Sequence, residues 1–264
     1  MTTELNALTA PLPGGGAIPL LGLGTWQLEG TEAYEATRAA LDIGYRHIDT
    51  ATGYSNEGRV GAALRDSRIE RTEVFVTTKC PPERAGREMQ TLEESLDALG
   101  VDFVDLWLVH WPPGGQARPA TWRQFISAQE VGKVRSIGVS NYSIGQIDEL
   151  IEATGHAPSV NQIPWSPFLY DRQTATALHD RGVVLEGYSP LKRSNLGHPT
   201  LVELARAYGK TPAQIVLRWH LDHGFVVIPK SARRERIQEN FDLGGFRLTD
   251  ADLARLDQVK GSGA

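Results

Sequence analysis

Short apolar segments rich in β-branched residues alternate along this chain with longer amphipathic segments. Most of the short segments are bounded by glycine or proline, a pattern typical of buried parallel strands. The pattern predicts eight strands: Leu20–Trp26, Tyr45–Ala51, Val74–Cys80, Val104–His110, Ser136–Asn141, Ser159–Ile163, Val183–Tyr188 and Phe225–Pro229.

The segments between these strands carry apolar residues at helical spacing, and glycines end several of them. Thr31 is the expected cap of the first helix, and Thr249 with Asp250 caps the last. The expected helices are Thr31–Asp42, Gly86–Leu99, Ile144–Ala153, Thr174–Asp180, Leu201–Tyr208, one that starts at Thr211-Pro212, one that follows the eighth strand, and Leu248–Val259.

Eight strand–helix units predict an α/β fold of the (β/α)8 (TIM) barrel type. The rival architecture is a doubly wound sheet, but Gly22-Leu23-Gly24 lacks the third glycine of its phosphate-binding turn. Leu12–Pro19 resembles an N-terminal β-hairpin that could close the lower end of the barrel. No linker interrupts the pattern, so residues 1–264 are expected to form a single domain with a C-terminal helix.

The chain has 27 Lys and Arg against 32 Asp and Glu, which gives a net charge of -5. We therefore expect neither nucleic acid nor an anionic membrane as a partner. Cys80 is the only cysteine, so an internal disulfide and a four-cysteine zinc site are excluded. No signal peptide or membrane-spanning segment is visible, and the expected location is cytoplasmic.

Four polar side chains stand where adjacent predicted strands end, which is the catalytic face of such barrels. They are Asp49, Tyr54, Lys79 and His110. Taken singly, each also fits a structural role, such as a capping carboxylate or a packed aromatic ring. A lysine that closes a buried strand needs a carboxylate partner, however, and Asp49 is the expected one.

Together these four groups could reduce a carbonyl. A phenol has a pKa of about 10, and a lysine cation at ~4 Å with an effective dielectric of ~20 would favour the phenolate by about 4 kcal/mol. We therefore expect Lys79 to lower the pKa of Tyr54, by roughly three units at most. Tyr54 would then act as the general acid, and His110 would orient the carbonyl. The sequence has no metal, flavin or nucleophile signature, which makes a nicotinamide cofactor the expected hydride donor.

Several motifs resemble those of the aldo-keto reductase superfamily, in particular bacterial members of the 2,5-diketo-D-gluconate reductase type. The resemblance covers nearly the whole chain, and it is carried by the order and spacing of the following segments: Gly22-Leu23-Gly24-Thr25-Trp26, Asp49-Thr50-Ala51, Tyr54, Asn56-Glu57, Val60-Gly61, Asp105-Leu106, His110-Trp111-Pro112, Gly138-Val139-Ser140-Asn141, Asn161-Gln162, Tyr188-Ser189-Pro190-Leu191 and Ile228-Pro229-Lys230-Ser231.

The resemblance implies roles for individual residues. Asp49, Tyr54, Lys79 and His110 would form a catalytic tetrad, and Trp26, Tyr54, His110 and Trp111 would meet the substrate, with Phe168 as a further candidate wall. Cofactor contacts are implied for Gly24, Thr25, Trp26, Ser140, Asn141, Gln162, Tyr188, Ser189, Pro190, Leu191, Lys230, Ser231, Arg236, Glu239 and Asn240.

Among these, Ser140, Asn141 and Gln162 would hold the nicotinamide carboxamide, and Tyr188 would stack on the ring. The family positions of Lys230, Ser231 and Arg236 hold a 2′-phosphate, and those of Glu239 and Asn240 meet the adenine. The basic start of a helix also suits a phosphate physically, which favours NADPH over NADH, although a merely solvated basic face is the alternative.

In relatives that reduce a steroid C=C bond, glutamate stands at the position of His110, so histidine here implies reduction of aldehydes and ketones. The loop Trp111–Pro119 is short, and we expect an open site with broad specificity for small carbonyl compounds. Two alternatives stay open: a reductase specific for a keto-sugar acid, and a nicotinamide-binding regulatory subunit. Family likeness suggests a monomer.

Overall fold

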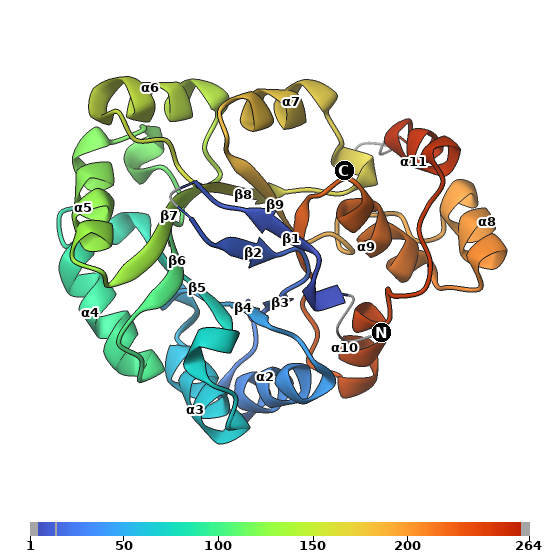
Figure 1. Ribbon diagram of the computed structural model, residues 1–264, viewed down its shortest axis with the longest axis horizontal. Helices are drawn as coiled ribbons and strands as arrows, with labels where there is room; N and C mark the ends of the chain where they lie inside the picture. Colours follow the sequence, from blue (N-terminus) through green and yellow to red (C-terminus); the bar gives the residue numbers. More distant parts are fainter. Residues whose placement is uncertain (1–4, 14, 260–264) are drawn as a thin grey trace.

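The computed structural model describes residues 5–13 and 15–259 and confirms the predicted (β/α)8 barrel (Figure 1). Eight parallel strands pair in sequence order, from the first to the last. Each lies within or close to one of the predicted segments. They are β3 (Leu23–Gly24), β4 (His47–Asp49), β5 (Phe75–Cys80), β6 (Val104–Val109), β7 (Val134–Ser140), β8 (Val160–Pro164), β9 (Val184–Tyr188) and β10 (Val226–Ile228).

The barrel closes where β3 meets β10. Leu21 forms an isolated parallel bridge with Val227, and the Gly22 N–H donates to the Val227 carbonyl at 2.9 Å. The strand is much shorter than the predicted Leu20–Trp26, and after Thr25 the chain turns, with the Leu28 N–H donating to the Thr25 carbonyl at 3.0 Å and Gln27 at φ 60°. There the backbone N–H and the hydroxyl of Thr25 both donate to the Asp49 carbonyl, at 3.0 and 2.9 Å.

Helices surround the barrel and fill the intervals between strands (Figure 1). Those that were expected from the sequence are α2 (Gly30–Ile43), α4 (Glu88–Leu99), α6 (Ile144–Thr154), α7 (Arg172–Asp180), α8 (Pro199–Tyr208), α9 (Pro212–Asp222), α10 (Arg234–Phe241) and α11 (Asp250–Asp257). Thr249 caps α11 as predicted, since its side chain accepts from the Asp252 N–H. Thr31 is not a cap: α2 begins one residue earlier, and its N-cap is Glu29.

Two further helices, α3 (Glu57–Ser67) and α5 (Pro119–Glu130), were not expected from the sequence. Two glycines weaken the helical pattern of α3. One of them, Gly61, is required by packing: a Cβ there would lie 2.6 Å from the Leu99 carbonyl carbon and closer still to its oxygen. The glycine therefore lets α3 lie directly on the end of α4.

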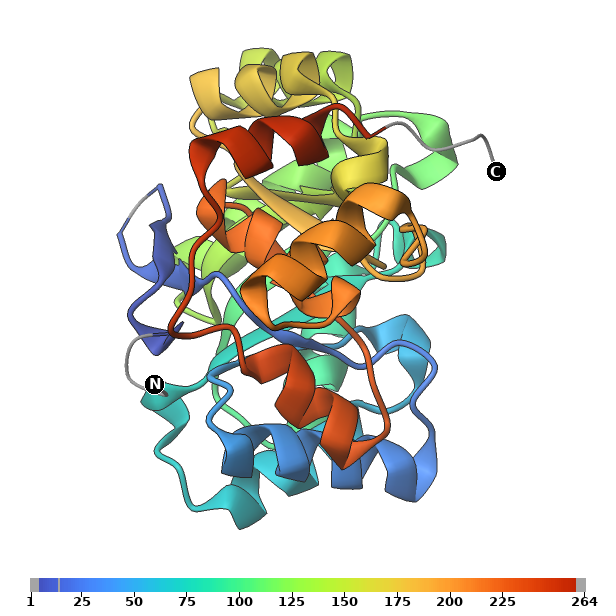
Figure 2. The ribbon, with the colours of Figure 1, turned by 90° about the vertical axis from the view of Figure 1, so that its right-hand side faces the viewer.

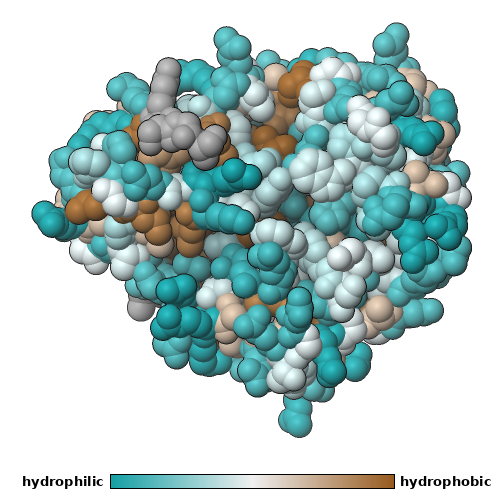
Figure 3. Space-filling view, turned by 180° about the vertical axis from the view of Figure 1, so that it is seen from behind, coloured by the Kyte–Doolittle hydropathy of each residue, from teal (hydrophilic) through white to brown (hydrophobic). Residues whose placement is uncertain are grey.

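An antiparallel hairpin, β1 (Thr9–Pro11) and β2 (Ala17–Pro19), covers one end of the barrel, as predicted (Figure 2). Its Ile18 side chain is fully buried. The hairpin packs at the amino ends of the strands, and Figure 3 shows the opposite face of the molecule. Within residues 5–13 and 15–259, no helix combines the length and apolar character needed to cross a bilayer.

Candidate active site

A cavity of about 590 Å³ lies at the carboxyl ends of the strands, and many of the predicted site residues line it. Three of the four proposed catalytic side chains and all four substrate candidates are on its wall, together with all four residues expected to bind the nicotinamide. The predicted residues that line the cavity are Gly24, Trp26, Asp49, Tyr54, His110, Trp111, Ser140, Asn141, Gln162, Tyr188, Ser189 and Lys230.

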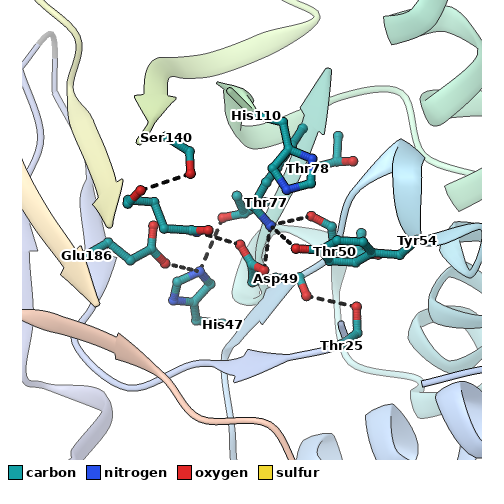
Figure 4. A network of polar contacts seen from close by, with 12 residues as sticks. Thr25, His47, Asp49, Thr50, Tyr54, Thr77, Thr78, His110, Ser140 and Glu186 are labelled. Atoms are coloured by element: carbon teal, nitrogen blue, oxygen red, sulfur yellow. Dashed lines mark hydrogen bonds and ion pairs between the residues drawn. The ribbon is translucent and has the colours of Figure 1, made fainter. Parts of the chain in front are cut away.

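Lys79 forms the floor of this cavity, where it contacts Asp49, Thr50 and Tyr54, whose arrangement Figure 4 shows. Its ammonium group is fully buried and donates to Asp49 Oδ1 at 2.6 Å and to the Thr50 carbonyl at 2.8 Å. Burial alone would lower the pKa of Lys79, but the Asp49 carboxylate, together with Tyr54 and Glu186, raises it above its usual value. The partner expected from the sequence is confirmed, and Lys79 stays charged.

Tyr54 ends the short 3-10 helix η1 (Thr52–Tyr54), which follows β4, and its hydroxyl lies 3.5 Å from Lys79 Nζ. Burial raises the pKa of Tyr54, and the opposing effect of Lys79 is smaller. The expected lowering of this pKa is therefore wrong in direction, because burial disfavours the phenolate more strongly than one neutralised ammonium favours it. Tyr54 is a protonated phenol at neutral pH.

His110 follows β6 and packs edge-on against Tyr54, with ring centroids 5.5 Å apart. Burial and the nearby Lys79 charge lower the pKa of His110 to about 3. Its imidazole is therefore neutral at physiological pH. Together with Tyr54 it presents two uncharged hydrogen-bonding groups to the cavity.

A hydrogen-bonded cluster on the opposite wall links β7, β8 and β9. The Tyr188 hydroxyl donates to Asn141 Oδ1 at 2.9 Å, and Asn141 Nδ2 donates to the His110 carbonyl at 3.2 Å. Gln162 Nε2 donates to Asp49 Oδ2 at 2.9 Å, and Ser140 Oγ donates to the Gln162 carbonyl at 2.8 Å. Asn141 has the left-handed backbone conformation, φ 63°, which is uncommon outside glycine. The cluster joins the two walls of the cavity through Asp49.

The donor set of this wall fits a nicotinamide. Amide and hydroxyl side chains suit the carboxamide group, the Tyr188 ring offers a flat apolar face, and Ser189 follows directly in the left-handed conformation, φ 54°. Three cations, Lys192, Arg193 and Lys230, also line the cavity and suit the phosphates of a dinucleotide.

The other residues predicted to bind cofactor do not line the cavity. Thr25 is fully buried and bonded to the Asp49 carbonyl, so its side chain supports the site from behind. Ser231 is buried at the start of the α10 segment, where its Oγ accepts from the Arg233 N–H, and Arg236 is exposed on α10. Pro190, Leu191, Glu239 and Asn240 also lie outside the cavity wall, and Asn240 is almost fully buried.

The substrate side of the cavity combines aromatic and charged groups. Trp26 and Trp111 are 43% and 49% exposed, values that leave large apolar faces open at the mouth. Lys192 Nζ lies 5.2 Å from the centroid of the Trp26 ring. Glu83, in η3 (Pro82–Arg84), brings a carboxylate to the wall after β5. Phe168 packs against His198 instead and does not line the cavity.

Sequence reasoning assigned no role to several residues on which the site depends. Asn56 is buried and donates to the Thr25 and Leu28 carbonyls, both at 2.9 Å, and so it fixes the segment that carries Trp26. His47 and Glu186 lie inside the barrel below the site. The signal for these residues was a polar side chain within a short buried strand or at the start of a helix.

Other chemistries have little support in the described part of the chain. Burial raises the pKa of Cys80 to about 12, so its thiol stays protonated at neutral pH and is a poor nucleophile. Residues 5–13 and 15–259 contain no cluster of three or more His, Cys, Asp or Glu side chains that could hold a metal ion.

Comparison with known proteins places this geometry in a family. The aldo/keto reductase family model matches residues 20–198 and 195–260. Methylglyoxal reductase DkgA of Escherichia coli K12 is 42% identical over 262 residues, which cover 97% of this chain and 95% of that protein. An aldo-keto reductase of Mycobacterium sp. strain JLS is 40% identical over 260 residues, which cover 97% of this chain and 94% of that protein.

Solved structures agree with the sequence comparisons. An aldo/keto reductase from Brucella melitensis superimposes with a TM-score of 0.91 at 40% identity and covers 96% of this chain and 99% of its own. An aldo-keto reductase of Bombyx mori in complex with NADP has a TM-score of 0.87 at 33% identity. The match covers 96% of this chain and 92% of that one. The chain therefore belongs to the aldo/keto reductase family, the NADP(H)-dependent oxidoreductases of carbonyl compounds.

Proposed function

We propose that this enzyme reduces small, uncharged aldehydes, ketones and α-dicarbonyls, such as methylglyoxal, and that Tyr54 donates the proton. The observation that carries the proposal is the buried Lys79 ammonium, held by Asp49 at 2.6 Å and facing the Tyr54 hydroxyl at 3.5 Å below an aromatic-lined cavity. The name of the Escherichia coli relative supports the choice of methylglyoxal.

Tyr54 and His110 would bind the oxygen of the substrate carbonyl. As negative charge develops on that oxygen, the Tyr54 hydroxyl transfers its proton to it, and the nearby Lys79 charge stabilises the phenolate that is left. His110 is neutral and can donate a second hydrogen bond without competing for the proton. Asp49 keeps Lys79 in place, so the charge that assists Tyr54 does not move during the reaction.

NADPH, when bound, would supply the hydride that the carbonyl carbon accepts. Ser140, Asn141 and Gln162 would hold its carboxamide, and Tyr188 would pack on the ring, so that one face of the nicotinamide meets the substrate. Gly24, Thr25, Trp26, Ser189, Pro190 and Leu191 would surround the middle of the cofactor through backbone and apolar contacts. The strained backbone at Asn141 supports this role, because such strain often accompanies binding sites.

The adenosine end of the cofactor would bind at the start of α10. Lys230 and Arg236 are exposed there, and Ser231 Oγ accepts from the N–H of Arg233, the N-cap residue of α10. Cations at a helix N-terminus suit a phosphate, and we assign the 2′-phosphate to Lys230, Ser231 and Arg236. Glu239 and Asn240, one helical turn further on, would approach the adenine.

The charge distribution of the cavity favours neutral substrates. Its three cations follow β9 and β10, where phosphates would neutralise them. Its acidic side chain on the substrate side, Glu83, follows β5 next to Pro81 and Pro82. Glu83 would repel a carboxylate substrate, and this disfavours the keto-sugar acid alternative, although Lys192 beside Trp26 brings a cation to the same side of the cavity. We also propose one catalytic domain over residues 1–264 that acts as a monomer, a state that light scattering would test.

We predict that Tyr54→Phe lowers the turnover of methylglyoxal at least 100-fold, the scale of losing a general acid. NADPH affinity should stay within about twofold, because only the proton donor is removed. Turnover is followed by the loss of reduced nicotinamide absorbance, and binding by calorimetry. Tyr34→Phe, on the outer helix α2, removes a hydroxyl bonded to Asp66 and is the control. Turnover by Tyr54→Phe within tenfold of wild type would mean that the acid is another group.

Arg236→Ala should weaken NADPH binding about 10- to 100-fold, the scale of a lost charged hydrogen bond. NADH binding should change less than about twofold, since NADH has no 2′-phosphate. Arg123→Ala on α5, on the opposite side of the barrel from α10 (Figure 1), removes the same charge and should change neither affinity. Equal losses for the two cofactors would contradict the 2′-phosphate assignment.

Glu83→Gln should raise kcat/KM for 4-carboxybenzaldehyde about threefold to fivefold, as expected for one exposed charge in partly screened solvent. The methyl ester of the same aldehyde, which is uncharged, should show no change. The gain should fall as salt is added. A gain of the same size for the ester would show that Glu83 acts through shape and not through charge.

A further inference from the structure

Two titratable side chains that the proposed mechanism does not use lie inside the barrel, below the catalytic residues. Glu186 is in β9 and His47 is in β4, and both are fully buried. Glu186 Oε1 lies 3.7 Å from His47 Nε2 (Figure 4). Glu186 is also the register partner of Gln162 on β8, the residue that donates to Asp49. Gln162 thus connects the Glu186–His47 pair to the Lys79–Asp49 ion pair.

The hydrogen bonds around His47 indicate which ring nitrogen carries the proton. Nδ1 lies 3.4 Å from the Pro19 carbonyl, which can only accept, so Nδ1 is the donor. Nε2 then carries the lone pair, to which the Thr77 hydroxyl donates at 3.2 Å, and Glu186 Oε1 lies beside it at 3.7 Å. An ionised Glu186 would face this electron-rich nitrogen with like polarity, whereas a protonated Glu186 would not.

The charges that face Glu186 lead to the same conclusion. Asp49 and His47 approach it from β4, Lys79 from β5 and Gln162 from β8. Lys79 is the cation among them, and Asp49 already holds it at 2.6 Å. Neither carboxyl oxygen of Glu186 has a hydrogen-bond donor within the described residues. A second carboxylate here would be buried with less compensation from Lys79 and Gln162 than its burial and the Asp49 charge cost, which is unfavourable.

We propose that Glu186 is a positioning residue that holds a proton next to His47 and so leaves Asp49 as the one carboxylate that balances Lys79. The predicted effect of Glu186 on the reduction rate rests on the proposed role of Tyr54 as the acid. The proton on Glu186 does not. In the neutral form, Glu186 packs below Gln162 and Asp49 without adding charge. In the ionised form it would place a second negative charge below the ammonium that assists Tyr54.

The direction of the pH effect follows from these positions. Burial and the Asp49 charge raise the pKa of Glu186 to about 8, and burial lowers the pKa of His47 to about 3, so at pH 7 both are neutral. Above pH about 8, Glu186 would lose its proton. Its charge raises the pKa of both Lys79 and Tyr54. Tyr54 then becomes a weaker acid, and carbonyl reduction should slow.

Infrared spectroscopy of the intact protein tests the proton directly. We expect a protonated carboxyl C=O band at pH 6 that shifts in D2O, disappears as the pH rises through about 8, and is missing in Glu186→Gln. Glu57 is a second buried acid, which accepts from Thr78 Oγ1 at 2.6 Å. Glu57→Gln is therefore the matched control and should keep the Glu186 band. If the protonated carboxyl band of the wild type is still present and unchanged in Glu186→Gln, the proposal is overturned.

The pH profile of kcat/KM for reduction tests the effect on Tyr54. In wild type the rate should fall with an inflection near the pH at which the infrared band is lost. In Glu186→Gln this inflection should move to higher pH, while the rate at pH 6 stays within about threefold, because glutamine keeps the size and the neutral charge. Superimposable profiles would overturn the proposal even if the band is present. If Tyr54 is not the acid, Tyr54→Phe will keep its turnover. The infrared band still shows in that case whether Glu186 is protonated.

Discussion

The buried ion pair between Lys79 and Asp49 is the interaction on which the rest of this site depends. Taking an ammonium group out of water costs several kcal/mol, and a carboxylate at 2.6 Å with further hydrogen bonds is what makes its burial possible. Lys79 has three donors, and they meet Asp49, the Thr50 carbonyl and the Tyr54 hydroxyl. The same contacts that satisfy the buried charge therefore place it next to the proposed acid.

The barrel supplies the positions that this pair needs. Parallel strands bring Asp49 and Lys79 to the same end of neighbouring strands, and Gln162 reaches the second Asp49 oxygen from across the barrel. Asn56 and Thr25 then fix the loop with Trp26 to the end of β4. Each polar group thus has a partner on a different strand or loop, and this makes the site rigid before any ligand binds.

Much of the fold and part of the site could be predicted from the chain. The eight strands follow from short β-branched segments with glycine and proline at their ends, and the partner of Lys79 follows from the cost of an unpaired buried cation. The helix α3 could not be predicted, because Gly61 serves its packing against Leu99 and weakens its helical pattern. The direction in which the pKa of Tyr54 is shifted could not be predicted either, since it depends on burial, which the sequence does not give.

Glu186 and His47 were missed for another reason. In a strand buried on both faces, polarity does not tell whether a side chain points into the barrel or toward the helices. Both residues point inward, where they add an acid and an imidazole to a floor that already has one ion pair. The charge state of the whole floor is therefore a property of the three-dimensional arrangement and not of any single motif.

The coupling free energy between Lys79 and Asp49 tests the central claim most directly. It is obtained from urea unfolding of wild type, Lys79→Met, Asp49→Asn and the double variant. Each single variant should lose about 3 to 5 kcal/mol, because it leaves one buried charge without a partner, and the double variant should lose no more than either single one. Losses that simply add in the double variant would contradict the account, since the two side chains would then contribute independently.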